Sequence, residues 1–285
     1  MLIICLVLYI WALQPGRYLN PKVLGNINEE NTMSKLPKEY RFLDFSDYGR
    51  PVARLIANSL KETSCTPIDV TLWFIVSGLI AIACILFEQH WFAAFFLVLK
   101  SILDAADGEL ARVKKTPSHT GRYLDSVADI LLNFLIFIAI WFSTESNMIF
   151  TFFAFLGIQL QGTLYNYYYV ILRNNVNGDT TSRVFEFDPP VALGAEKQEN
   201  VDLLFRIYKG LYGAFDKVIY LLDSNASKSK KIPKLLMTAL STFGLGFQLL
   251  IISFMLVFGF KDYIIAFFIC YSPMVFVFIG VRKLT

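Results

Sequence analysis

Two short acidic stretches decide the fold: Asp104-Ala-Ala-Asp107-Gly108-Glu-Leu-Ala111-Arg112, and, eight residues later, Gly121-Arg-Tyr-Leu-Asp125-Ser-Val-Ala-Asp129. On a helix, Asp104 and Asp107 share a face, and so do Asp125 and Asp129. Apolar runs flank the two stretches at 91–103 and 130–142. Each run is shorter than the roughly 20 residues that a membrane helix needs. We therefore predict that both helices continue through the acids, which places four carboxylates on membrane helices.

The composition is typical of a membrane protein. Of 285 residues, 55% are hydrophobic and 17% are charged, whereas soluble domains carry about 25% charged residues. Four further apolar runs lack charged residues and approach or exceed the length of a span: 70–87, 148–172, 235–260 and 263–281. The predicted fold is thus an all-α, polytopic membrane protein with six transmembrane helices over residues 66–283. A long insertion at 173–234 separates the fourth span from the fifth.

The segment before the spans, residues 1–65, has three parts. Residues 1–13 are apolar and could be a short anchor, a misplaced start or a weak signal sequence. Residues 14–37 read as a linker. Residues 38–61 mix basic and apolar side chains, which fits either a helix in the membrane interface or an ordinary solvent-facing helix. In the insertion, apolar residues recur at helical spacing over 201–222, so we expect an interfacial helix there as well.

The basic residues predict the orientation. All 26 Lys and Arg residues except Lys100 and Lys261 lie before the first span, after the sixth, or in two connections on that same side. By the positive-inside rule, this side faces the cytoplasm. The acidic ends of the second and third spans lie there too, so we expect a multi-pass protein whose active site faces the cytoplasm. The net charge of +3 gives no reason to expect a nucleic-acid partner.

Four neighbouring carboxylates at membrane depth repel one another and are costly to desolvate. Divalent cations such as Mg²⁺ would neutralise them, because hard ions take oxygen ligands and bridge phosphates. Arg112 offers a forked donor for phosphate, and Gly108 and Gly121 permit a close approach of a ligand to the backbone. Two other interpretations stay open: a solvated loop with its own salt bridges, and a pathway for protons or cations. The scattered cysteines and the two histidines do not suggest a metal site.

The pattern D-x2-D-G-x2-A-R-x8-G-x3-D-x3-D resembles the signature of the class I CDP-alcohol phosphatidyltransferases. The resemblance implies a six-helix membrane fold, commonly a homodimer, with a polar cavity open to the cytoplasm. It implies two divalent cations, Mg²⁺ or Mn²⁺, held by Asp104, Asp107, Asp125 and Asp129. Asp129 would also be the general base that deprotonates the acceptor alcohol. The site for the CDP-linked donor would be formed by Gly108, Ala111, Arg112 and Gly121.

The resemblance implies a phospholipid-synthesising enzyme that releases CMP. We expect CDP-diacylglycerol as the donor and a small alcohol as the acceptor; the alternative is a CDP-choline or CDP-ethanolamine donor with a lipid alcohol as the acceptor. An ion-coupled transporter and a catalytically dead scaffold are rivals from other classes. Lys100 either forms an ion pair with the acids or contacts phosphate, and Arg183 either binds an acceptor phosphate or forms a loop salt bridge. The tyrosines at 165–169 fit an interfacial aromatic belt.

Overall fold

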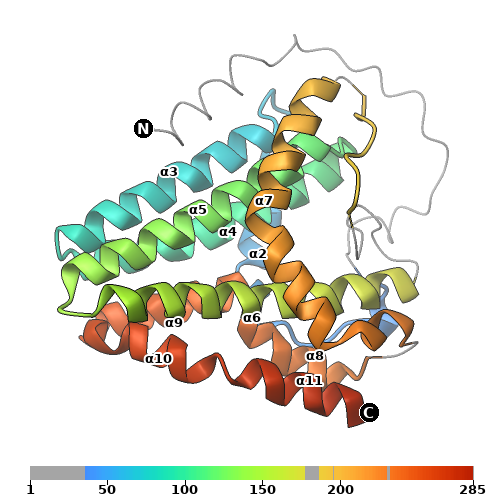
Figure 1. The fold of residues 1–285 in the computed structure, drawn as a ribbon. Coiled ribbons are helices and arrows are strands. Elements are labelled where there is room, and N and C mark those ends of the chain that lie inside the picture. Colours follow the sequence, from blue (N-terminus) through green and yellow to red (C-terminus); the bar gives the residue numbers. More distant parts are fainter. Residues whose placement is uncertain (1–35, 177–185, 195, 230–231, 285) are drawn as a thin grey trace.

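The computed structural model describes residues 36–176, 186–194, 196–229 and 232–284, and within these ranges every regular element is a helix. The apolar segment 1–13 and Arg183 lie outside the described residues. Figure 1 shows the helices as one elongated bundle, with a further helix crossing it at a steep angle. The predicted all-α class is therefore confirmed.

The acidic signature lies on α4 (His90–Lys114) and α5 (His119–Ser143), which are neighbours of α3 (Pro67–Leu86) (Figure 1). Thr66 starts α3 with a capping box, in which its side chain and that of Asp69 bond each other's backbone N–H groups. Ser118 caps α5 by accepting from the N–H of Gly121 at 2.8 Å. Lys115 ends α4 in the left-handed conformation. The predicted continuation of both short apolar runs through the acidic residues is thus confirmed.

The remaining spans pack beneath these three helices. The next helix, α6 (Met148–Asn175), contacts α10 (Ile264–Tyr271), and α9 (Leu245–Val257) contacts α4. The largest apolar core joins residues from all of these spans, including Ala81, Leu97, Ile136, Ala154, Leu249 and Phe268. The chain ends with α11 (Met274–Leu284), which packs on α8 (Lys234–Leu240) and α6.

Four helical segments in the described part of the chain are long and apolar enough to cross a membrane: α3, α5, α6 and the stretch Lys261–Leu284. A fifth is obtained if α8 and α9, which are bent by 51°, form one broken span. Of the six predicted spans, the remaining one is α4, which carries Lys100, Asp104 and Asp107 within its apolar part. Those same charges make α4 the helix of chemical interest.

The bend after α8 admits a segment from the N-terminal side. At the break, Gly244 and Gly246 approach the short helix η2 (Phe45–Asp47) so closely that a Cβ on Gly246 would lie 2.0 Å from the Ser46 carbonyl oxygen. The N–H of Phe45 also donates to Ser241 Oγ at 2.9 Å. The sequence predicted one apolar run over 235–260, and the two glycines explain why that run is broken: no side chain fits between the two segments.

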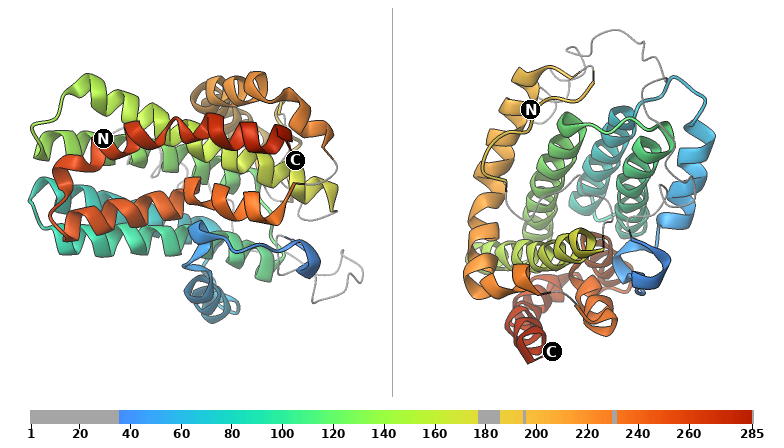
Figure 2. Two further views of the ribbon diagram at one scale, coloured as in Figure 1. Left: turned by 90° about the horizontal axis from the view of Figure 1, so that it is seen from below. Right: turned by 90° about the vertical axis from the view of Figure 1, so that its right-hand side faces the viewer.

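Two helices flank the bundle. The predicted amphipathic helix at 38–61 begins later than expected: α2 covers Arg50–Leu60, and its buried Ala53 and Ala57 pack with Leu103 and Ala106 of α4. The predicted helix in the insertion is confirmed as α7 (Gln198–Leu222), which packs on α5 and α6. Figures 1 and 2 show α7 running steeply along one side of the bundle, while α2 lies on another side.

Candidate active site

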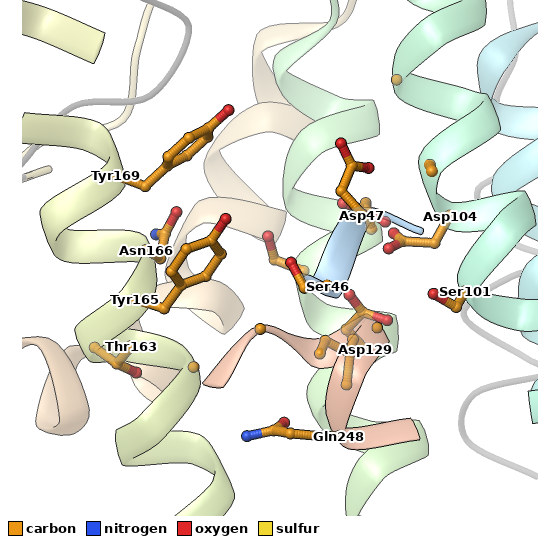
Figure 3. A pocket seen from close by; sticks show the side chains of 18 of the residues that line it. Ser46, Asp47, Ser101, Asp104, Asp129, Thr163, Tyr165, Asn166, Tyr169 and Gln248 are labelled. Carbon is orange, nitrogen blue, oxygen red and sulfur yellow. The ribbon is translucent and has the colours of Figure 1, made fainter. Parts of the chain in front are cut away.

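A polar cavity of about 390 Å³ lies between the two flanks. Its walls come from η2, α2, α4, α5, α6, α7 and the start of α9. Figure 3 shows Asp104, Asp129, Ser46, Asp47 and the tyrosines of α6 around this space. The volume falls within the ordinary range of small-ligand sites, but the number of charged side chains along the wall is high for a cavity between apolar helices.

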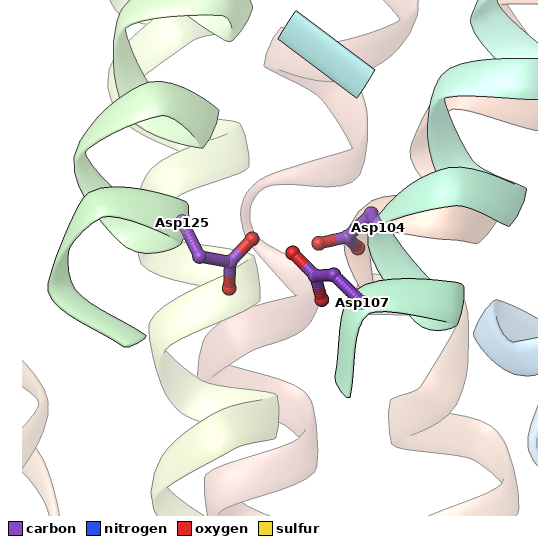
Figure 4. A group of neighbouring side chains, drawn as sticks. All are labelled: Asp104, Asp107 and Asp125. Atoms are coloured by element: carbon purple, nitrogen blue, oxygen red, sulfur yellow. The ribbon is translucent and has the colours of Figure 1, made fainter. Parts of the chain in front are cut away.

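Three carboxylates converge at one wall of the cavity. Asp104 and Asp107 of α4 and Asp125 of α5 each offer an oxygen, and these oxygens lie within 4.8 Å of one another. Figure 4 shows Asp125 reaching from its helix toward the two acids on the other. Thr71 of α3 donates to Asp107 Oδ2 at 2.6 Å, which fixes one side of the group. The juxtaposition predicted from the spacing of the acids is therefore present for these three.

These three residues fit a divalent cation. Their ligand atoms are all carboxylate oxygens, which suit Mg²⁺ or Mn²⁺. Asp125 Oδ1 is buried and has no hydrogen-bond donor among the described residues, so the group of three contains an oxygen with unused acceptor capacity. Such a carboxylate is costly to bury unless a positive charge compensates it.

Asp129 lies apart from the group of three. It also lines the cavity, but its Oδ1 accepts from Lys100 Nζ at 2.6 Å. The Lys100 side chain is fully buried, and its ammonium also lies 5.0 Å from the centre of the Phe74 ring. Of the two roles considered for Lys100, the structure shows the ion pair. Since α4 supplies the ammonium and α5 the carboxylate, this contact joins the two signature helices.

Two arginines bring positive charge to the cavity, Arg112 from α4 and Arg50 from α2. Both are held by Glu109, which is almost completely buried and pairs with Arg112 Nη2 at 3.1 Å and with Arg50 Nη1. Asp47 forms a second ion pair with Arg50. The arginines are thus fixed on the side of the cavity that carries the acids of α4, an arrangement suited to binding a phosphate group near the carboxylates.

The insertion forms part of the wall. Tyr208, Tyr212 and Asp216 of α7 line the cavity, and Tyr212 Oη donates to the Ser126 carbonyl oxygen of α5 at 3.0 Å. Burial, reinforced by repulsion from Glu186, raises the pKa of Asp216 to about 6. The segment before α7 is fastened to the start of α5 at two points, and these contacts fix how α7 lies on the cavity.

The first of these points is Glu186, which pairs with Arg122 through two bonds of 2.5 and 2.7 Å and accepts from Tyr123 Oη at 2.5 Å. The second is Glu196, which accepts from Ser118 Oγ and the Thr120 N–H, both at 2.7 Å. Burial alone would raise the pKa of Glu196, but these bonds to the charged carboxylate lower it.

Helix α6 supplies tyrosines to the opposite wall. Tyr165 and Tyr169, interpreted from the sequence as part of an interfacial belt, line the cavity instead (Figure 3). Their rings stack at 5.7 Å, and Tyr165 Oη donates to Asp44 Oδ2 at 2.5 Å. Tyr168 is fully buried, and its hydroxyl bonds Asp223. These tyrosines therefore join α6 to the flanking segments.

The residues predicted to bind the donor are only partly brought together. Gly108 and Arg112 line the cavity, whereas the described lining includes neither Ala111 nor Gly121. Gly121 lies in the first turn of α5, where a Cβ would come within 3.1 Å of the capping Ser118 oxygen. This close packing against Ser118 is enough to explain why a small residue is found at the start of the helix, so a bound ligand is not needed to explain it. Arg183 lies outside the described residues.

Sequence reasoning missed most of the wall opposite the acids. The polar residues Gln159, Thr163 and Asn166 of α6 and Gln248 of α9 lie in apolar runs, and all line the cavity. Polar side chains inside a predicted span are a signal of function in their own right. The stretch 44–50 carries two acids and an arginine between apolar residues, and it was assigned to a surface helix because nothing in its spacing indicates the contact with Gly244 and Gly246.

The comparisons with known proteins agree with the acidic signature. Residues 65–183 match a family model described as CDP-alcohol phosphatidyltransferase. This range contains α3, α4, α5, α6 and every carboxylate of the group of three. A search of curated proteins found no match to the chain.

Proposed function

We propose that this chain is an enzyme of the CDP-alcohol phosphatidyltransferase family, whose model matches residues 65–183, and that it transfers a substituted phosphate from CDP-diacylglycerol to an alcohol and releases CMP. The observation that carries the proposal is the convergence of Asp104, Asp107 and Asp125 within 4.8 Å in the wall of a polar cavity. Two arginines near those acids support the binding of a diphosphate.

The proposed reaction is a displacement at phosphorus. Asp129 takes the proton from the acceptor hydroxyl, and the acceptor oxygen attacks the phosphorus that bears the diacylglycerol group. The P–O bond to the cytidylyl phosphate breaks, and CMP leaves with the bridging oxygen. The position of Asp129 beside the group of three, within the same cavity, supports this role, because a general base must lie within reach of the acceptor.

Asp104, Asp107, Asp125 and Asp129 would hold two divalent cations, Mg²⁺ or Mn²⁺. When bound, such ions neutralise the diphosphate and stabilise the charge that develops on the departing CMP. Arg112 and Arg50 would orient the phosphates, and Gly108 would leave room for the nucleotide beside Arg112. The buried Asp125 Oδ1, which lacks a donor among the described residues, supports the cation requirement.

The chain would work as a multi-pass membrane enzyme with six spans, in which α4 crosses the bilayer beside α3 and α5. The charged residues of α4 support this arrangement because Asp104, Asp107 and Arg112 line the polar cavity, and Lys100 and Glu109 are buried in ion pairs. The positive-inside distribution of Lys and Arg supports a cavity that opens to the cytoplasm. We also propose a homodimer, the form common in the family.

The decisive experiment measures CMP release by the purified full-length protein in detergent or vesicles. CDP-diacylglycerol is supplied with a panel of alcohols in the presence of Mg²⁺ or Mn²⁺. We expect CMP and a new phosphodiester lipid in equal amounts, loss of both on adding EDTA, and recovery when the metal is restored. CMP release that is unaffected by EDTA would contradict the metal requirement. The absence of CMP release with every alcohol and donor tested would contradict the proposed activity.

A further inference from the structure

One acid of the cavity has no role in the proposed chemistry. Asp216 lies on α7 and lines the cavity together with the signature acids of α4, and its side chain is partly buried. Among the described residues it forms no ion pair and no hydrogen bond, and its charged neighbour is another acid, Glu186. A buried carboxylate without a cationic partner is unfavourable, and a ligand that carries a positive charge would relieve it.

Aromatic rings surround this carboxylate. Tyr208 and Tyr212, two turns and one turn before Asp216 on α7, both line the cavity and stack with ring centroids 5.1 Å apart. Tyrosine rings attract ammonium groups, including quaternary ones, through the negative charge of the ring face. An acid beside two tyrosines therefore offers the two interactions by which proteins bind amines.

This corner adjoins the reacting centre. Tyr212 Oη donates to the carbonyl oxygen of Ser126, the residue between the acids Asp125 and Asp129 on α5. Asp216 and Asp129 both line this cavity, so a small alcohol whose charged group contacts α7 can present its hydroxyl to Asp129 within the same space.

The charge balance of the whole cavity favours a cation. Its described lining contains seven aspartates and two arginines. Just behind the lining, the positive charge of Lys100, paired with Asp129, and the negative charge of Glu109, paired with both arginines, cancel each other. The cavity therefore stays negative even with two divalent ions bound. The donor's diphosphate makes the balance more negative still. An acceptor with its own phosphate would add to this excess, a polyol would leave it unchanged, and an amine would reduce it.

From these observations, and resting on the proposed function, we infer that the alcohol is an amino alcohol whose ammonium binds Asp216, Tyr208 and Tyr212. This cation could enter in two forms with the same chemistry: as a free amino alcohol attacking CDP-diacylglycerol, or as the head of a CDP-amino alcohol attacked by a diacylglycerol. In both forms the ammonium lies a few bonds from the reacting phosphorus, next to the same wall.

The test compares substrates that differ only in charge. In one arm, CDP-diacylglycerol is offered with choline, with ethanolamine, with the uncharged choline analogue 3,3-dimethylbutan-1-ol, with inositol and with glycerol 3-phosphate. In the other, CDP-choline or CDP-ethanolamine is offered with diacylglycerol. We expect CMP release with an amino alcohol in one of the two arms, and the arm that responds identifies the source. Turnover only with inositol or glycerol 3-phosphate would overturn the inference and leave the proposed function intact.

Two variants of α7 assign the effect to Asp216. Asp216→Asn should raise KM for the cationic substrate by roughly tenfold or more, the loss expected for one charge pair, with little change in KM for the uncharged analogue. The matched control is Asp202→Asn on the same helix; Asp202 accepts from Gln198 at 2.8 Å and is absent from the described lining. An equal rise in KM for charged and uncharged substrates, or in both variants, would overturn the assignment.

A binding measurement separates failure of the inference from failure of the proposed activity. With Mn²⁺ present, choline should raise the thermal unfolding midpoint of the wild-type protein, whereas 3,3-dimethylbutan-1-ol at the same concentration should not. Asp216→Asn should lose this stabilisation. A choline-dependent shift without CMP release in any arm would support the cation site and contradict the transferase; equal shifts with both compounds would overturn the cation site.

Discussion

Lys100 Nζ donates to Asp129 Oδ1 at 2.6 Å, so the proposed general base is paired with a fully buried ammonium from the neighbouring helix. The contact gives Asp129 a compensating charge that Asp125 lacks among the described residues. Asp129 is not a member of the group formed by Asp104, Asp107 and Asp125. Lys100 and a bound cation can satisfy the same carboxylate, and this relationship leads to a prediction about each.

Replacing Lys100 by Met should destabilise the metal-free protein by about 3 kcal/mol, because removing one partner leaves a buried charge uncompensated. Thermal unfolding in EDTA measures this loss. In the double variant Lys100→Met, Asp129→Asn the uncompensated charge is gone, so we expect most of the stability to return. If the double variant is as unstable as Lys100→Met, the loss comes from packing and not from the ion pair.

The same variant reports on the metal. If Asp129 can reach a cation, Mg²⁺ should raise the unfolding midpoint of Lys100→Met more than that of the wild type, because the ion replaces the lost ammonium. Equal shifts in the two proteins would show that Asp129 does not share the cation held by the other three acids. Asp129 would then keep the role of base alone.

Asp125→Asn should lower the apparent affinity for Mg²⁺ or Mn²⁺ by roughly a hundredfold or more, since changes even to residues that only support metal ligands cost 10–100-fold. The measurement is the metal concentration that gives half-maximal CMP release. The control is Asp262→Asn, which removes an exposed carboxylate on the short helix Lys261–Tyr263. Unaltered metal dependence in Asp125→Asn would remove this residue from the metal site.

These residues show which parts of the candidate site could be predicted from the sequence. The spacing of the four aspartates predicted that α4 and α5 bring carboxylates together, because helical periodicity and span length are local properties. The group of three agrees with that prediction. Lys100 lies one turn before Asp104 on the same face, which indicated an ion pair with one of the acids. The sequence could not place Asp129 with Lys100 rather than with the other acids, since that depends on how two helices pack.

The wall of the cavity opposite the acids could not be predicted from the sequence for a different reason. Ser46 approaches Gly246 across 200 residues of chain, and Tyr212 reaches Ser126 across 86. Such contacts depend on tertiary packing, which leaves no periodic pattern in the sequence. The polar residues inside the apolar runs, such as Gln248, did carry a signal, because a membrane helix rarely contains them without a partner or a ligand.

Glu109 should act as a positioning residue for two arginines. It is 1% exposed and holds both Arg50 and Arg112 at the cavity. Glu109→Gln removes the charge that fixes them, so we expect KM for the CDP donor to rise by roughly tenfold while KM for the alcohol stays constant. Arg54→Gln is the control, because Arg54 lies 3.8 Å from Glu109 and its side chain is half exposed. Equal changes in both KM values would indicate a general loss of structure.

Asp216 should make stability depend on pH, with a sign set by its raised pKa. Burial, with repulsion from Glu186, raises that pKa to about 6 in the folded protein, against an ordinary value of 3.8. The folded state therefore holds the proton of Asp216 more tightly than the unfolded state does. As a result, the contribution of Asp216 to the free energy of unfolding falls as the pH rises from about 4 to 6.

Asp216→Asn should remove this part of the pH dependence. The variant should match the wild type near pH 4 and exceed it at pH 7 by on the order of 1–3 kcal/mol. Unfolding midpoints measured across this range, without substrate, check the prediction, with Asp202→Asn as the matched control. If the difference in stability between Asp216→Asn and the wild type does not grow between pH 4 and 7, Asp216 is ionised at little cost in the folded protein. A carboxylate ionised at little cost would need no cation from a ligand, so the same result would also weaken the case for an amine at this wall.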